Sequence, residues 1–231
     1  MRRLALLLTL LVLCAPARGA DPLTDAIAQV YPDYRAALFR TNNGPQEAAL
    51  TAIRSTAAGW QALAARFTPP LPVPYADETG WPALAARVAV VLGKAEVEAV
   101  AGQLAASHET LEEIRDLLGA LRARNGVVTF SDAMNLYHAE MERAAPLAAE
   151  GLAKLAELRE LAGVLHHLAE RLLPAASDTL RADPDFGAME AANRAAVATF
   201  RTAVRAGDPA AILRTAQGLR GPYSRLFLRF G

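Results

Sequence analysis

The segment RNGVVTFSDAMNLYHAEMER, Arg124–Arg143, contains the pattern that recurs through the whole chain. An Asn-Gly pair that can end a helix is followed by a short turn, in which Thr129 or Ser131 can cap the next helix. Apolar residues then return every three or four positions, as on one face of a helix. Elsewhere Ala, Leu, Arg and Glu dominate, and no alternating run indicates a strand. The sequence therefore predicts an all-α fold.

Proline and glycine divide the chain into expected helices. Pro45 and Pro209 suit the first turn of a helix, whereas the proline-rich segment 68–82 predicts a surface excursion. We expect the 82–124 helix to break near Gly93 and the 131–172 helix to bend at Pro146. The expected helices span about 23–40, 45–67, 82–124, 131–172, 186–206 and 209–220.

Two segments near the ends of the chain resemble each other. Each consists of a helix, a turn containing Gly and Pro, a second helix and the pattern aromatic-x-x-Leu-x-x-Arg-Phe, which ends at Phe67 and at Phe230. Trp60 and Tyr223 align and should both be buried. Duplication explains the likeness, and so do two amphipathic hairpins of similar composition. We expect one domain over 21–231, an antiparallel helical bundle with a long central helix pair flanked by these two similar hairpins.

The amino terminus has the features of a secretory signal peptide. Arg2 and Arg3 precede the apolar run Leu4–Leu13, and small residues lead to an expected cleavage after Ala20. A lipid anchor is not expected, because Leu13 occupies the position before Cys14 where a small residue belongs. Removal of residues 1–20 takes away the single cysteine and changes the formal net charge from zero to −3. We therefore expect a periplasmic or secreted protein without disulfides.

Several classes of function have no support in the sequence. The chain has no basic patch for nucleic acid, and its apolar run is too short for a membrane span. Nucleophile-elbow, phosphate-loop, dinucleotide and zinc-protease motifs are also missing. An enzyme is thus less favoured than a binding protein.

His138 is the strongest candidate for a functional residue. It lies between Met134 and Met141 on the expected apolar face, and Glu142 follows four positions later. A buried imidazole needs a hydrogen bond or a metal, and thioethers are soft ligands that suit copper. The alternative is a hydrogen-bonded core histidine beside methionines that fill gaps.

His108 and Glu112 form a second pair with the same spacing on the preceding helix. Together the two pairs could offer imidazole and carboxylate to copper, iron or zinc, with haem b a weaker candidate. A turn centred on residues 127 and 128 places Glu112 beside Glu142, however. The two histidines are then roughly 13 Å apart along the axis, at ~1.5 Å per residue, too far for one ion. A slipped register, or the bend expected at Pro146, would still bring part of the set together. The alternative role for Glu112 is a surface ion pair with Arg115 or Arg143.

The alanine-rich helices, the signal peptide and the lack of a retained cysteine resemble exported helical bundles of the cytochrome b562 and cytochrome c′ type. This resemblance is architectural and implies an all-α periplasmic protein. The C-x-x-C-H motif for covalent haem is absent, so no residue role carries over from these families.

Two functions remain open. The first is an exported protein that binds or handles a metal ion through His138, with Met134, Met141, Glu142, His108 and Glu112 as further ligands. The second is a metal-free helical scaffold that binds another envelope protein. The expected partners are a metal ion or an envelope protein, and a homodimer is a further option.

Overall fold

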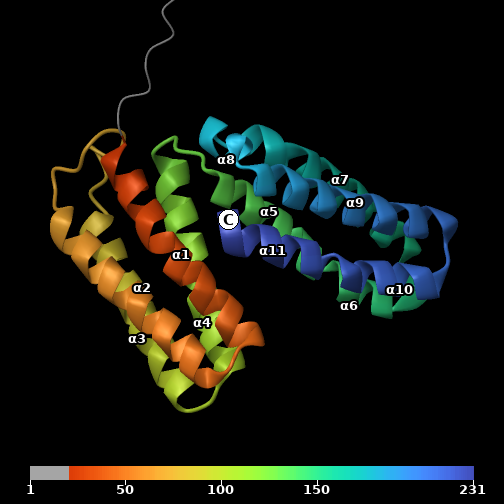
Figure 1. The fold of residues 1–231 in the computed structure, drawn as a ribbon, viewed down its shortest axis with the longest axis horizontal. Coiled ribbons are helices and arrows are strands. Elements are labelled where there is room, and N and C mark those ends of the chain that lie inside the picture. The colour runs from red at the N-terminus through yellow and green to blue at the C-terminus, as the bar shows by residue number, and fades with distance from the viewer. Residues whose placement is uncertain (1–20) are drawn as a thin grey trace, which may run out of the picture.

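The computed structural model describes residues 21–231, which are all-α (Figure 1). The fold class predicted from the sequence is confirmed. The expected signal peptide, residues 1–20, lies outside the described residues. None of the helices in residues 21–231 has the length and apolar character that crossing a bilayer requires.

The amino-terminal half of the described chain forms an up-and-down four-helix bundle, the first bundle. Each helix packs against the next, and α1 and α4 close the ring (Figure 1). Asp21 caps the first of these helices by accepting a hydrogen bond from the Thr24 amide at 3.0 Å. The helices are α1 (Pro22–Asn43), α2 (Gln46–Arg66), α3 (Trp81–Val100) and α4 (Leu104–Arg124).

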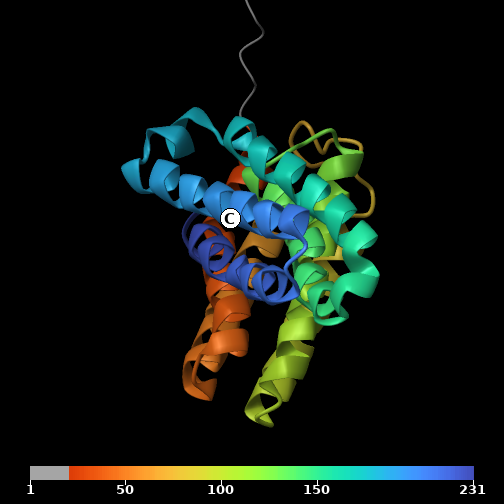
Figure 2. The same cartoon turned by 90° about the vertical axis from the view of Figure 1, so that its right-hand side faces the viewer.

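The carboxy-terminal half forms the second bundle, in which α5, α7, α9 and α11 pack in a ring and α6 packs on α10. Its helices run across those of the first bundle rather than along them (Figures 1 and 2). The elements are α5 (Phe130–Glu142), α6 (Ala144–Ala149), the 3-10 turn η1 (Gly151–Lys154), α7 (Leu155–Ala175), α8 (Asp178–Ala182), α9 (Pro184–Ala206), α10 (Pro209–Gly218) and α11 (Arg220–Phe230).

The two longest predicted helices are each divided, which corrects the expected long central pair. The 82–124 segment breaks at Gly102 rather than at Gly93. The 131–172 segment is interrupted at Arg143, between α5 and α6, where the missing amide hydrogen of Pro146 favours a break, and it then reverses at Gly151. Both glycines have a positive φ, 77° and 75°, which other residues rarely adopt. Each segment is therefore a hairpin that completes one of the two bundles.

The two similar end segments occupy similar environments. In the first, the Arg66 guanidinium lies 5.1 Å from the ring centre of Phe67, and in the second Arg229 lies 5.2 Å from that of Phe230. The aligned Trp60 and Tyr223 are both buried, as predicted. The segments differ in their second helix. In the first segment this helix, α2, is continuous, whereas in the second segment it is divided into α10 and α11.

A buried ion pair determines the direction in which α5 leaves α4. Asp132 completes a capping box with Thr129 at the start of α5. The same carboxylate accepts three hydrogen bonds from Arg122 of α4, at 2.6 to 3.0 Å. Arg122 is almost fully buried, so the pair fixes the crossing of the two helices.

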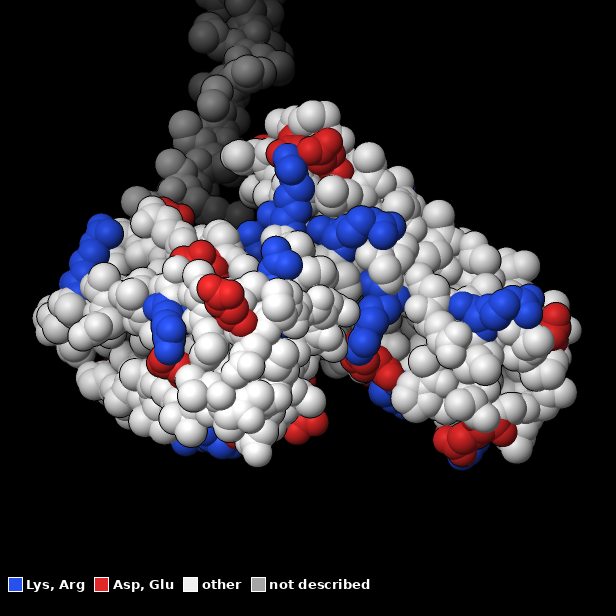
Figure 3. Space-filling view, turned by 60° about the horizontal axis from the view of Figure 1, so that its bottom comes forward, with Lys and Arg blue, Asp and Glu red and all other residues white. Residues whose placement is uncertain are grey.

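The core is continuous across both bundles, with buried residues from every long helix in one cluster. Contacts of α11 with α1 join the bundles at their meeting point. The space-filling view shows the surface hollowed between them, with side chains of both charges at the edge of the hollow (Figure 3).

Candidate functional site

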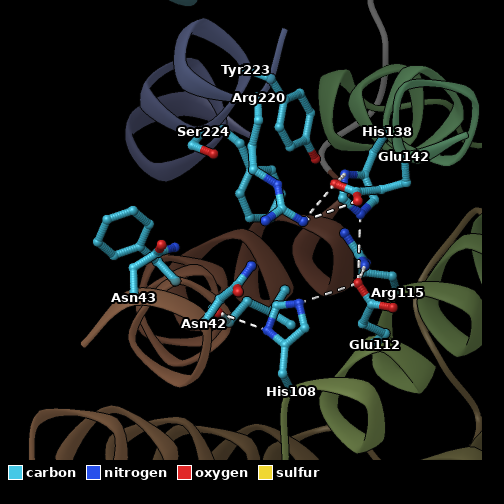
Figure 4. A pocket seen from close by; sticks show the side chains of 13 residues that line it. Asn42, Asn43, His108, Glu112, Arg115, His138, Glu142, Arg220, Tyr223 and Ser224 are labelled. Carbon is cyan, nitrogen blue, oxygen red and sulfur yellow. Dashed lines mark hydrogen bonds and ion pairs between the residues drawn. The ribbon is translucent and has the colours of Figure 1, made fainter. Parts of the chain in front are cut away.

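A pocket of about 340 Å³ lies where the two bundles meet. Helices α1 and α4 of the first bundle and α5 and α11 of the second contribute its walls. Part of the wall is apolar, formed by Leu38, Phe39 and Phe227. The remaining wall carries a concentration of ionisable groups, namely His108, Glu112, Arg115, His138, Glu142 and Arg220 (Figure 4).

The orientation of the His108 ring is determined by α1. Its Nδ1 lies 2.9 Å from the backbone carbonyl oxygen of Leu38 and 3.1 Å from the hydroxyl oxygen of Thr41. A carbonyl oxygen can only accept, so Nδ1 carries the hydrogen and donates it. In the neutral ring Nε2 then has a free lone pair, which faces the pocket.

Glu112 lies between the two histidines. Its Oε1 is 3.5 Å from His108 Nε2 and 3.5 Å from His138 Nε2, and Figure 4 shows both rings directed toward this carboxylate. A lone pair on His108 Nε2 and a carboxylate oxygen are both acceptors. Such an arrangement is stable when a proton or a cation lies between them.

The ring of His138 stacks on Tyr223 of α11, with centres 5.0 Å apart and planes inclined by 21°. Its Nδ1 is buried without a hydrogen-bond partner, and the nearest carboxylate oxygen, Glu142 Oε1, is 3.9 Å away. The stacking therefore holds the ring in place, while Nε2 stays directed at Glu112.

Two arginines balance the two carboxylates. Arg115, one turn along α4, pairs with Glu112, and its side chain is about one-tenth exposed. Arg220 at the start of α11 donates to both oxygens of Glu142, at 3.0 and 3.2 Å. With neutral imidazoles the pocket has no net charge.

Glu112 is held in its anionic form. Burial is the largest influence and raises the pKa of this carboxyl group. The contacts with His108 and His138 and the charge of Arg115 act in the opposite direction and outweigh burial. The pKa of Glu112 consequently lies well below its ordinary value.

The structure brings together four of the six residues that the sequence singled out. His108, Glu112, His138 and Glu142 all line the pocket. Met134 and Met141 do not line it, because their side chains are buried in the core. The expected ion pair between Glu112 and Arg115 is also present.

The predicted separation of the two histidines was wrong. The register assumed that α4 and α5 run antiparallel along each other, with His108 and His138 far apart. Instead α4 packs along α1 and α3, whereas α5 packs along α7 in the other bundle. The two helices cross, and both imidazoles reach the same oxygen of Glu112.

Sequence reasoning missed the contribution of α11 and of the end of α1. Arg220 and Ser224 line the pocket from one side, and Asn42 and Asn43 from another. No spacing in the sequence connects these asparagines or residue 220 with residues 108–142. Only the closure of the second bundle brings Arg220 to Glu142.

The donor set fits a metal ion in part. Imidazole nitrogen and carboxylate oxygen bind zinc, iron and copper at 2.0 to 2.2 Å, which makes the edge of a tetrahedral site about 3.4 Å. The two distances of 3.5 Å from Glu112 Oε1 match such edges. Within residues 21–231, however, no three His, Cys, Asp or Glu side chains are already gathered closely enough to hold an ion. Binding of an ion therefore requires the side chains of this donor set to move closer together.

Comparisons with models of protein families, with curated proteins and with solved structures gave no match to this chain.

Proposed function

We propose that the protein binds a divalent transition-metal ion in the junction pocket, with His108 Nε2, His138 Nε2 and Glu112 Oε1 as ligands. The observation that carries the proposal is the equal 3.5 Å spacing of one carboxylate oxygen from two imidazole nitrogens. Three protein ligands leave at least one position of a tetrahedral ion open to the pocket.

The surroundings of His108 support a role as ligand. Metal-binding histidines commonly donate their second ring nitrogen to a carbonyl or carboxylate, which fixes the tautomer. The Leu38 carbonyl oxygen, 2.9 Å from Nδ1, provides this partner. Glu142 is the corresponding group near His138 and can receive its Nδ1 hydrogen after a small rotation.

The ligand types favour zinc, iron(II) or copper(II). Imidazole and carboxylate suit these ions, whereas copper(I) prefers thioethers. The thioethers of Met134 and Met141 are buried away from the pocket, so we no longer include them in the ligand set. Arg115 competes for Glu112 and must release its carboxylate when the ion binds.

The alternative function, a metal-free scaffold for another envelope protein, is favoured by one feature. Val90, Val97 and Val100 are more than half exposed along one side of α3. Exposed apolar side chains on one helix can mark a protein-binding surface. This surface belongs to the first bundle and does not use the pocket.

Calorimetric titration with zinc tests the proposed function. We expect the wild type to bind one zinc ion, and His108→Ala and His138→Ala to abolish stoichiometric binding. His167→Ala is the matched control, because His167 is exposed on α7 and does not line the pocket. Binding should weaken in acid, since the imidazoles must be deprotonated. Equal binding by wild type and His138→Ala would exclude the site.

A further inference from the structure

The pocket is much larger than a metal ion requires. Its volume is about 340 Å³, whereas one water molecule takes up about 30 Å³ of liquid. Pockets for small molecules begin at about 300 Å³. After an ion occupies the space around Glu112, most of the pocket remains for a second ligand.

The charges of the pocket indicate the sign of that ligand. Glu112 and Glu142 balance Arg115 and Arg220, and the imidazoles that bind an ion are neutral. A divalent ion therefore adds two positive charges to a balanced site. Such an excess in a partly enclosed pocket favours an anion that carries two negative charges.

Arg220 is placed to bind the anion. Its side chain is 54% exposed, and its pair with Glu142 is at the pocket edge. An exposed ion pair contributes little to stability, so Arg220 can exchange Glu142 for an incoming carboxylate at little cost. The planar guanidinium matches a carboxylate with two parallel hydrogen bonds.

The rest of the wall suits an organic molecule rather than a bare inorganic ion. Phe39 and Phe227 offer apolar surface for a carbon skeleton. Asn42, Asn43 and Ser224 add hydrogen-bonding groups, and Figure 4 shows them on the side of the pocket away from Glu112.

We propose that the pocket holds its ion together with a small organic anion bearing at least two carboxylates, one on the open position of the ion and one on Arg220. This proposal rests on the metal site described under the proposed function. The protein would then recognise a metal carboxylate complex rather than the ion alone.

Titration of malonate into zinc-loaded protein tests this proposal, with zinc content measured before and after. We expect malonate to bind the zinc-loaded wild type and not the metal-free protein. Arg220→Ala should weaken malonate binding by at least about tenfold, as loss of charge-assisted hydrogen bonds predicts. The same change should not weaken zinc binding, because it removes a positive charge from the pocket. Arg220→Lys should give an intermediate affinity for malonate, because lysine keeps the charge but lacks the planar guanidinium that makes two parallel hydrogen bonds. Arg225→Ala is the matched control, since Arg225 is exposed on the same helix outside the pocket.

The possible results separate the two proposals. Zinc binding without any malonate binding overturns the second ligand and leaves the metal site standing. Equal malonate binding with and without zinc overturns the dependence on the ion. Binding of inorganic phosphate in preference to malonate overturns the carboxylate class. Absence of zinc binding removes the metal site, and the metal carboxylate complex with it.

Discussion

At the scale of the residue, Glu112 connects the two histidines to Arg115 and keeps its charge in a partly buried position. Its pKa is lowered in the folded protein, so folding favours the ionised form. The resulting stability is fully present above the pKa of the unfolded chain, near 4.5, and is lost as the pH falls below that value. Because the side chain is 38% exposed, solvent reduces the size of this contribution.

Glu112→Gln should remove this acid-sensitive contribution. We expect the melting temperature of the variant to fall less steeply than that of the wild type between pH 4.5 and pH 3, measured by scanning calorimetry in metal-free buffer. Glu109→Gln, an exposed change on the same helix, should follow the wild-type curve. Parallel curves for wild type and Glu112→Gln would show that the His108 and His138 contacts do not stabilise the carboxylate.

The spacing of residues identified much of this site before the structure. Positions four apart share a helix face, and this placed His108 with Glu112 and His138 with Glu142. The meeting of the two pairs at Glu112 could not be predicted in the same way. It depends on the angle between α4 and α5, which helical periodicity does not contain. The same periodicity led us to include Met134 and Met141. A helix face has a buried centre and partly exposed edges. The two methionines are buried, whereas His138 lies at an edge and lines the pocket.

At the scale of the element, the junction between α4 and α5 depends on Asp132. This carboxylate accepts a hydrogen bond from the backbone amide of Thr129, as part of the capping box of α5. It also neutralises Arg122, whose side chain is only 3% exposed. Without Asp132 a buried guanidinium would have no counter-charge, and the start of α5 would lose the carboxylate half of its capping box. Loss of one partner of a buried ion pair typically costs about 3–5 kcal/mol.

We therefore expect Asp132→Ala to lower the free energy of unfolding by about 3–5 kcal/mol in urea titrations. Asp132→Asn, which keeps the shape and part of the hydrogen bonding, should cost less. The control is Asp116→Ala, an exposed change in α4. Zinc affinity should also fall in Asp132→Ala, since α5 positions His138. If Asp132→Ala were as stable as Asp116→Ala, the ion pair would not determine how the two helices cross.

Helix existence was predictable from sequence, but helix length was not. The apolar repeat continues across Gly102 and Gly151, so periodicity alone extends each helix through its break. Glycine is compatible with both a helix interior and a turn, and Gly93 lies inside α3 with open space around it. Which glycine turns the chain is decided by the packing of each hairpin into its bundle.

At the scale of the whole molecule, the pocket exists because the chain closes on itself. Arg35 of α1 donates to the carbonyl oxygens of Arg229, at 3.2 Å, and of Gly231 at the end of α11. This contact joins elements that are separated by most of the described sequence. No local pattern predicts it, and this explains why Arg220 was absent from the expected site.

The pairing of aromatic rings in the first bundle has an optical consequence. Both tryptophans of the chain, Trp60 and Trp81, lie there, with ring centres 5.9 Å apart and almost no exposed surface. Tryptophan fluorescence consequently reports on α2 and α3 alone, whereas far-ultraviolet circular dichroism averages over both bundles. Because the core is continuous, we expect the two signals to give coincident urea transitions. A fluorescence transition displaced from the dichroism transition would instead show that the bundles unfold as separate units. Tryptophan fluorescence would then follow the first bundle and would not detect unfolding of the second.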